Sequence, residues 1–242
     1  MLRAACAVSF WLWMVGCGGG GKVEKKAAEA PGAVGEPVSR EVPSVVAGED
    51  GRPVVAAFGD SISAGFGVPP GKGYADDLQK LIDEAALRFR VVNLGVSGDT
   101  TADGVERLQS VLAVHPAVVI LEFGGNDGLR GQPVSESGKN LRKMVEGLKA
   151  AGAEVVLAGM TLPRNYGPEY IGAFDKMYMD VAKEYRLVRI PFLLDGVGGH
   201  ADLMQPDGIH PNVTGAEMVA RTAMKYLEPV LARLDKGSGL KQ

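Results

Sequence analysis

Two short segments of the sequence hold the residue types that acyl-transfer chemistry requires. Gly-Asp-Ser-Ile-Ser occupies residues 59–63, and Asp207 stands three residues before His210 in Asp-Gly-Ile-His. A serine hydroxyl becomes a useful nucleophile only when a neighbouring base removes its proton. A carboxylate beside an imidazole fixes the tautomer of that base and stabilises the imidazolium that forms. We therefore expect Ser61 to act as nucleophile, His210 as general base and Asp207 as the carboxylate that orients the base.

The choice of base and nucleophile leaves alternatives open. The chain contains three histidines. His115 precedes an apolar run, at the wrong end of that run for catalysis, and is expected to be a turn residue. His200 lies in a loop that could reach the serine, and it is a rival base. Ser63 is an alternative nucleophile, although by this position the chain is expected to have begun a helical turn, and Asp60 is expected to be a turn or cap residue.

An attacked carbonyl group also needs donors for the negative charge that develops on its oxygen. Gly98, in Ser-Gly-Asp-Thr, has no Cβ, so its backbone N–H could approach a substrate closely. Asn126, in Gly-Gly-Asn-Asp, offers a neutral side-chain amide. Each has a structural alternative, which is a plain turn glycine for the first and a left-handed loop residue for the second. Both would complete an acyl-transfer site if they lay beside the serine.

Apolar runs alternate with amphipathic stretches through most of the chain. Continuous apolar runs are typical of strands buried on both faces, and apolar residues spaced three and four apart indicate helices. The alternation predicts an α/β fold, a three-layer α/β/α sandwich with a doubly wound, mostly parallel sheet of about five strands. The expected strands are residues 53–58, 90–95, 117–123, 154–160 and 187–190, and the expected helices are 74–89, 101–114, 135–152, 168–185 and about 212–232.

The polar segments follow the expected strands directly. Residues 59–63 follow the first strand, 96–100 the second and 124–128 the third, and residues 205–212 lie in the loop after the fifth. In open parallel sheets, ligands bind beyond the carboxyl ends of the strands. The four segments are therefore expected to share one edge of the sheet and to form one site.

The N-terminal part of the chain predicts export. Residues 1–17 combine an early basic residue with a short apolar stretch and end in Met-Val-Gly-Cys, as in a signal peptide with a lipobox-like end. Cys17 is expected to be lipidated, with simple signal cleavage as the alternative. Residues 18–51 are expected to be a flexible linker, residues 52–235 one folded domain, and residues 236–242 a C-terminal tail. We expect an exported lipoprotein, anchored to a membrane and facing the periplasm or the cell exterior.

The composition excludes several classes of function. A formal net charge of −3 gives no basic field, so nucleic acid is not an expected partner. The two cysteines, Cys6 and Cys17, both lie in the expected signal peptide. The folded domain is therefore expected to have no disulfide, no cysteine nucleophile and no thiolate metal site. The chemistry described above requires no metal and no cofactor, and none is expected.

Four segments together resemble the conserved blocks of the SGNH/GDSL hydrolases, and in particular their secreted thioesterase, arylesterase and lysophospholipase group. Gly-Asp-Ser-Ile-Ser resembles the first block, Ser-Gly-Asp-Thr the second, Gly-Gly-Asn-Asp the third and Asp-Gly-Ile-His-Pro the fifth, over about residues 54–230. The lipobox-like signal and the long linker depart from the family pattern. The resemblance implies a flavodoxin-like SGNH fold, a catalytic triad and an oxyanion hole: Ser61, Asp207 and His210 for the triad, and Ser61, Gly98 and Asn126 for the hole.

The resemblance also implies an activity. We expect a serine esterase for acyl esters or thioesters, such as aryl or short-chain esters, or for lysophospholipids. The loop of residues 160–174, with Tyr166, Tyr170 and Phe174, either lines an acyl cleft or packs into the core. Two other functions remain open: removal of O-acetyl groups from cell-wall or exported polysaccharide at the same site, and a lipoprotein module that binds without catalysis.

Overall fold

A computed structural model of the protein describes residues 50–237. The expected signal peptide with Cys17, and the expected linker as far as residue 49, lie outside the described residues. Of the expected tail, Lys236 and Gly237 belong to the last helix, and the rest also lies outside. The sheet, its helices and the apolar core all fall within residues 50–237, so a chain that begins at residue 18 retains the complete domain.

The described residues form one sheet of five parallel strands in the order β2-β1-β3-β4-β5. This arrangement confirms the predicted α/β class and the strand number. β1 and β3 lie in the middle, and most of their residues are buried because helices cover both faces. The strand bounds are β1 Val54–Gly59, β2 Arg90–Asn93, β3 Pro116–Glu122, β4 Glu154–Ala158 and β5 Val188–Ile190.

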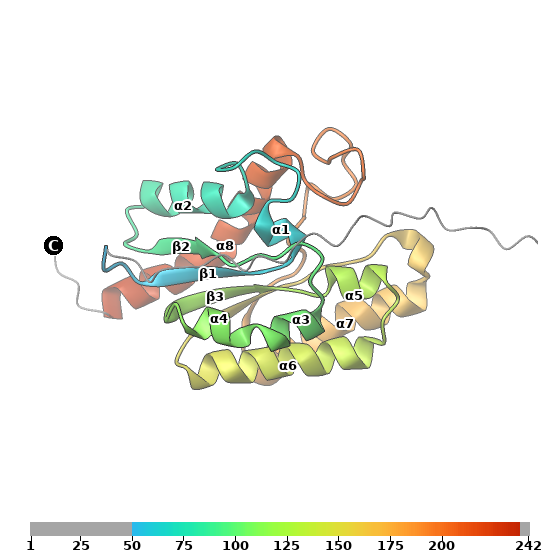
Figure 1. Cartoon of the computed structure of the whole chain (residues 1–242), viewed down its shortest axis with the longest axis horizontal. Coiled ribbons are helices and arrows are strands. Elements are labelled where there is room, and N and C mark those ends of the chain that lie inside the picture. Colours follow the sequence, from blue (N-terminus) through green and yellow to red (C-terminus); the bar gives the residue numbers. More distant parts are fainter. Residues whose placement is uncertain (1–49, 238–242) are drawn as a thin grey trace, which may run out of the picture. The chain divides into compact units, whose positions relative to one another are not determined.

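Two groups of helices enclose the sheet (Figure 1). α2 and α8 pack against each other on one face, and α3, α4, α6 and α7 cover the other. Leu78 and Ile82 of α2, and Leu141 and Leu148 of α6, point inward and are fully buried. The helix bounds are α1 Ser61–Ala64, α2 Tyr74–Glu84, α3 Thr101–Glu106, α4 Leu108–Leu112, α5 Gly125–Leu129, α6 Val134–Ala150, η1 Arg164–Tyr166, α7 Pro168–Tyr185 and α8 Val213–Gly237.

The structure differs from the predicted elements mainly at their ends. The predicted helix 101–114 is interrupted at Arg107, which ends α3 and begins α4. The predicted helix 74–89 ends near residue 85 because Ala86 adopts a positive φ of 54°. The short helices α1, α5 and η1 were not predicted as elements, since segments this short show no apolar periodicity. Within residues 50–237, no helix combines the length and the apolar character needed to cross a bilayer.

Candidate active site

The turn between β1 and α1 positions Ser61 at the carboxyl edge of the sheet. Gly59 ends β1, and a Cβ at this position would collide with the side chains of Glu122 and Ser63. Asp60 caps α1, because its carboxylate accepts a hydrogen bond from the N–H of Ile62 at 3.1 Å. Ser61 is the first residue of α1 and is partly exposed. The turn therefore presents the hydroxyl of Ser61 while its neighbours anchor the backbone.

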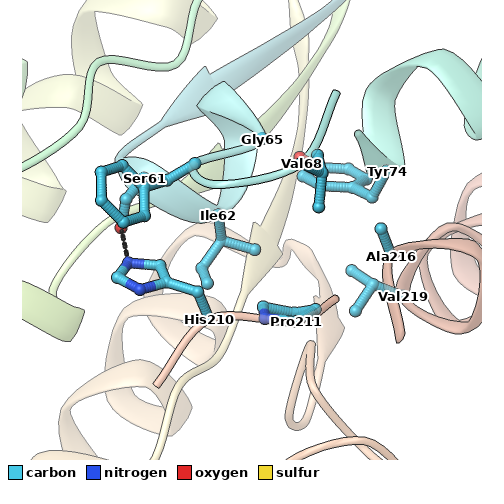
Figure 2. A pocket seen from close by; sticks show the side chains of 10 residues that line it. Ser61, Ile62, Gly65, Val68, Tyr74, His210, Pro211, Ala216 and Val219 are labelled. Carbon is cyan, nitrogen blue, oxygen red and sulfur yellow. Dashed lines mark hydrogen bonds between the residues drawn. The ribbon is translucent and has the colours of Figure 1, made fainter. Parts of the chain in front are cut away.

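Ser61, His210 and Asp207 form a continuous hydrogen-bonded row. The Nε2 atom of His210 lies 2.8 Å from the Oγ atom of Ser61, and a dashed line marks this hydrogen bond in Figure 2. The Nδ1 atom of His210 lies 2.7 Å from the Oδ2 atom of Asp207. The structure thus brings together two residues that are 149 positions apart in the sequence. The first distance allows the imidazole to take a proton from the serine hydroxyl, and the second allows the carboxylate to orient the imidazole.

The loop that carries the histidine holds the carboxylate in its charged form. Oδ1 of Asp207 accepts hydrogen bonds from the backbone N–H groups of Ile209 at 2.9 Å and His210 at 3.0 Å. Partial burial raises the pKa of Asp207, but these backbone bonds and the imidazole outweigh that effect, so the pKa lies below its usual value. A charged carboxylate favours the tautomer of His210 with a proton on Nδ1 and a free acceptor at Nε2.

The alternatives to these residues lie elsewhere. His115 is exposed at a left-handed position before β3, at the opposite edge of the sheet. His200 is exposed in the loop after β5, and no hydrogen bond joins its imidazole to Ser61 within the described residues. Ser63 is fully buried, and its hydroxyl contacts Glu122 at 2.9 Å and Tyr74 at 3.1 Å. None of these three is arranged to act as base or nucleophile beside His210.

The two expected oxyanion donors lie on neighbouring loops. Gly98 has a φ of +87°, so its backbone requires glycine for conformation, and Arg130 donates to its carbonyl oxygen at 3.1 Å. Nδ2 of Asn126 donates to Oδ2 of Asp60 at 3.1 Å and to the carbonyl oxygen of Asp99 at 2.9 Å. An amide nitrogen has two hydrogens, so both are engaged. Asn126 must release one of these bonds before it can donate to a substrate.

A buried carboxyl group supports the β1–α1 turn from below. Oε2 of Glu122 accepts hydrogen bonds from the N–H of Asp60 at 3.1 Å and from the N–H and hydroxyl of Ser63 at 3.3 and 2.9 Å. Burial raises the pKa of Glu122 well above its usual value, and the charge of Asp60 adds to this effect. Burial likewise raises the pKa of Asp60 to about 6. The raised pKa favours the protonated, neutral form of Glu122, which acts as a structural acceptor.

Arg107 joins the ends of two strands to the loop that contains Gly98. Its guanidinium donates to the carbonyl oxygens of Gly59 and Leu94, both at 2.7 Å, and forms an ion pair with Asp99. The guanidinium also lies 4.5 Å above the ring of Phe58. Sequence reasoning did not identify this role for Arg107. The available signal was an arginine in the middle of a predicted helix that otherwise had an apolar face.

A second polar contact joins the loops after β2 and β3. The carboxylate of Asp127, next to Asn126, accepts hydrogen bonds from the N–H of Thr101 at 2.8 Å and its hydroxyl at 2.6 Å. Ser137 of α6 donates to the same carboxylate at 2.9 Å. Asp127 is 1% exposed, so these bonds are shielded from water. They fix the start of α5, which carries Asn126, against the start of α3.

An apolar cleft of about 470 Å³ opens beside the serine. Side chains from the loops after β3, β4 and β5 line it together with the catalytic candidates, and its apolar members include Leu129, Met160, Leu162, Phe192, Leu194, Met204 and Ile209. The first part of the predicted loop, residues 160–164, contributes to the lining. Within the described residues, no group of three or more His, Cys, Asp or Glu side chains is arranged to hold a metal ion.

Of the two alternatives left open for the aromatic side chains of that loop, the structure supports packing, not lining of the cleft. Phe174 is 1% exposed and packs edge-on against Tyr178, in the core. The hydroxyl groups of Tyr166 and Tyr170 donate to the backbone carbonyls of Leu129 at 2.9 Å and Gln132 at 2.7 Å. These hydrogen bonds turn both rings toward the segment after α5. The aromatic residues therefore support the wall of the cleft from behind.

Comparison with known proteins identifies the family. The GDSL-like Lipase/Acylhydrolase family matches residues 57–218. The chain belongs to this family. Esterase TesA of Pseudomonas aeruginosa is 44% identical over 174 residues, which cover 72% of this chain and 87% of that protein. Thioesterase 1/protease 1/lysophospholipase L1 of Escherichia coli is 38% identical over 175 residues, which cover 72% of this chain and 83% of that protein.

The solved structures agree with this assignment. A crystal structure of TesA superposes with a TM-score of 0.71 and 42% identity, over 73% of this chain and 99% of that chain. The family match extends from β1 into α8 and so includes all four polar segments. The protein is thus an ester hydrolase of the SGNH/GDSL type, and the predicted SGNH hydrolase fold is confirmed.

Proposed function

We propose that the protein is a serine esterase in which Ser61 is the nucleophile, His210 the general base and Asp207 the orienting carboxylate. The observation that carries this proposal is the hydrogen-bonded row of these residues, with distances of 2.8 and 2.7 Å, at an apolar cleft. No metal and no organic cofactor takes part in the proposed chemistry.

The proposed reaction is a double displacement. His210 takes the proton of Ser61 as the serine oxygen attacks the ester carbonyl carbon and a tetrahedral intermediate forms. The imidazolium then donates this proton to the leaving alcohol or thiol, and an acyl-serine remains. His210 then deprotonates a water molecule, which attacks the acyl-serine; the bond between the acyl carbon and the serine oxygen breaks, the imidazolium returns its proton to that oxygen, and the carboxylic acid is released. Asp207 stabilises the imidazolium in both halves of the reaction.

The oxyanion is proposed to be held by the N–H groups of Ser61 and Gly98 and by the amide of Asn126. Because both hydrogens of the Asn126 amide are engaged in the free protein, the amide must exchange one partner for the oxyanion. The bond to Asp60, at 3.1 Å, is longer than the bond to the carbonyl of Asp99, at 2.9 Å. We expect the bond to Asp60 to be the one that is released.

The proposed substrates are acyl esters or thioesters with an apolar chain, lysophospholipids among them. The cleft is lined mainly by apolar side chains, and its volume lies in the range of pockets that bind small molecules. An acetyl group would leave most of this apolar lining without contact. The cleft thus favours longer acyl chains over the removal of O-acetyl groups, and the family assignment argues against a module that only binds.

The proposed location is outside the cytoplasm. Residues 1–17 are proposed to direct export, Cys17 to carry a lipid, and residues 18–51 to link this anchor to the domain of residues 52–235. This proposal depends on the composition of the N-terminal segments.

The test is a panel of p-nitrophenyl esters from acetate to laurate, assayed with the wild-type protein and with Ser61→Ala. We expect kcat/KM to rise with chain length beyond acetate, and we expect Ser61→Ala to lose at least about 10⁴-fold. His210→Ala is expected to lose a similar factor, and His200→Ala serves as the matched control with full activity. Equal rates for wild type and Ser61→Ala would contradict the proposal. Activity on acetyl esters alone would favour the O-deacetylase instead.

A further inference from the structure

Two strongly exposed apolar side chains flank the candidate active site. Phe66 is 49% exposed, and its ring centroid lies 4.6 Å from that of His210. Ile209 is 43% exposed, directly precedes His210 and lines the cleft. Among the described residues, two other large apolar side chains are exposed, Met179 in α7 at 47% and Val188 at the amino end of β5 at 39%. Single exposed apolar side chains are common, but two of them flanking one binding cleft point to an interaction surface.

The two loops that carry these side chains are fastened together. Nε2 of Gln205 donates to the carbonyl oxygen of Phe66 at 2.7 Å and to that of Pro211 at 2.9 Å. Gly67 has a φ of +75°, and the side chain of Gln205 occupies the place where a Cβ would stand. Phe66 and Ile209 are therefore held in position before any partner binds, which reduces the entropy lost on binding.

The loop beyond Phe66 has the chemistry of a segment that contacts lipid. Pro69 and Pro70 are exposed and have no N–H groups, so this part of the backbone loses fewer hydrogen bonds to water on entering a headgroup layer. Lys72, also exposed, follows after Gly71. A lysine beside apolar side chains suits the boundary between phosphate groups and acyl chains.

We infer that Phe66 and Ile209 dock the catalytic edge of the domain onto the surface of a phospholipid bilayer, with Lys72 among the phosphate groups. Ile209 is exposed and also lines the cleft, so in this orientation an acyl chain passes from the bilayer into the cleft along its side chain. This continuity favours lipid over a protein partner. The use of the surface in catalysis rests on the proposed esterase function, whereas the docking itself does not.

The length of the chain before the domain permits this orientation. The domain begins at β1, whose amino end lies at the opposite edge of the sheet from Ser61, about 20 Å away for six residues of strand. From Cys17 to Arg52 the chain could extend to at most roughly 115 Å. An anchor at Cys17 would therefore leave enough chain for the catalytic edge to face the same membrane.

The first test uses tryptophan as a reporter. The two tryptophans of the sequence are Trp11 and Trp13, so a chain that begins at residue 18 has none. In this chain with Ser61→Ala, a single tryptophan replaces Phe66 or Ile209, and Met179→Trp is the matched control. With vesicles of equal phosphatidylcholine and phosphatidylglycerol, we expect a shift of emission to shorter wavelength and quenching by brominated acyl chains at positions 66 and 209 only. Unchanged emission at both positions would overturn the inference.

The second test measures binding itself by sedimentation with the same vesicles. Relative to the Ser61→Ala chain, Phe66→Ser and Ile209→Ser should each lower the partition coefficient about tenfold, and Met179→Ser and Val188→Ser should not change it. Equal losses in all four variants, or no binding before substitution, would overturn the inference. A dimer of the Ser61→Ala chain in analytical ultracentrifugation that becomes a monomer with Phe66→Ser would also overturn the inference, because a second copy would then cover the surface. The proposed function predicts that Ser61→Ala is inactive. The binding results with this variant therefore do not depend on the outcome of the ester assays.

Discussion

Glu122 offers the sharpest test of how the candidate site is supported. Replacing it by alanine removes the acceptor for two backbone N–H groups, those of Asp60 and Ser63, in a fully buried place. Each buried donor left without a partner costs about 1–3 kcal/mol, so the two together cost about 2–6 kcal/mol. The hydroxyl of Ser63 keeps its contact with Tyr74 and adds little. For a domain of this size, we expect the midpoint of thermal unfolding to fall by at least about 5 °C.

Glu122→Gln is the matched control because it keeps the shape and one acceptor oxygen. Among the described residues, no donor reaches the second oxygen, Oε1, so the amide nitrogen that replaces it displaces no donor. The amide can also donate to Asp60, with which the side chain of Glu122 shares a hydrogen bond. We expect Glu122→Gln to lie within about 1 kcal/mol of the wild type at low pH. Chemical denaturation with both variants measures the difference. A glutamine variant as unstable as the alanine variant would refute the view that Glu122 acts as a neutral acceptor.

The same pair predicts how stability depends on pH. The pKa of Glu122 is raised in the folded protein, chiefly by burial, so the folded state binds its proton more tightly than the unfolded state. The stability that this proton contributes is complete below the unfolded pKa and decreases as pH rises toward the folded pKa. From pH 5 to pH 8 the wild type should therefore lose stability relative to Glu122→Gln, by up to about 1.4 kcal/mol per pH unit. A constant difference over this range would contradict the reasoning.

Three further predictions concern the catalytic loops. Asn126→Ala should lower kcat about 10²- to 10³-fold on a p-nitrophenyl ester with little change in unfolding midpoint, and a change confined to KM would contradict an oxyanion role. Arg107→Met should lower the free energy of unfolding by about 3 kcal/mol, measured with urea, because it removes the guanidinium from the buried Asp99 and from two strand ends. Asp207→Asn should lower kcat about 10⁴-fold through the wrong tautomer of His210. The pKa of Asp207 is lowered in the folded protein, so its carboxylate stabilises the fold at pH values above its unfolded pKa. This stabilisation is lost as pH falls through the folded pKa. In acid denaturation, Asp207→Asn should not show this loss.

The parts of the site that lie directly after strands could be predicted from the sequence. The five strands were found from their apolar runs, and the polar segments after them do lie at one edge of the sheet. The proximity of Ser61 and His210 was anticipated because both segments follow strands, and the contact is present in the structure. The roles of these residues in catalysis remain predictions.

The supporting residues could not be predicted, for a physical reason. Glu122 lies near the end of an apolar run, and only the three-dimensional structure shows that two backbone N–H groups of the β1–α1 turn converge on it. Arg107 has the appearance of an exposed helical residue until its guanidinium is seen at the ends of β1 and β2. The place of the aromatic residues at 166, 170 and 174 was left open because sequence spacing does not show which side of η1 and α7 meets the cleft. In each case the deciding partner is remote in sequence.

The packing of α8 against α2 has a consequence for how the chain matures. Leu78 and Ile82 of α2 are fully covered, and the helix that packs beside them is the last one in the described chain. During synthesis, this apolar surface remains uncovered until α8, residues Val213–Gly237, has emerged. Domains with such late contacts expose apolar surface in their intermediates. Loss of α8 should thus produce a chain that aggregates while it is being made, although every catalytic candidate is already present.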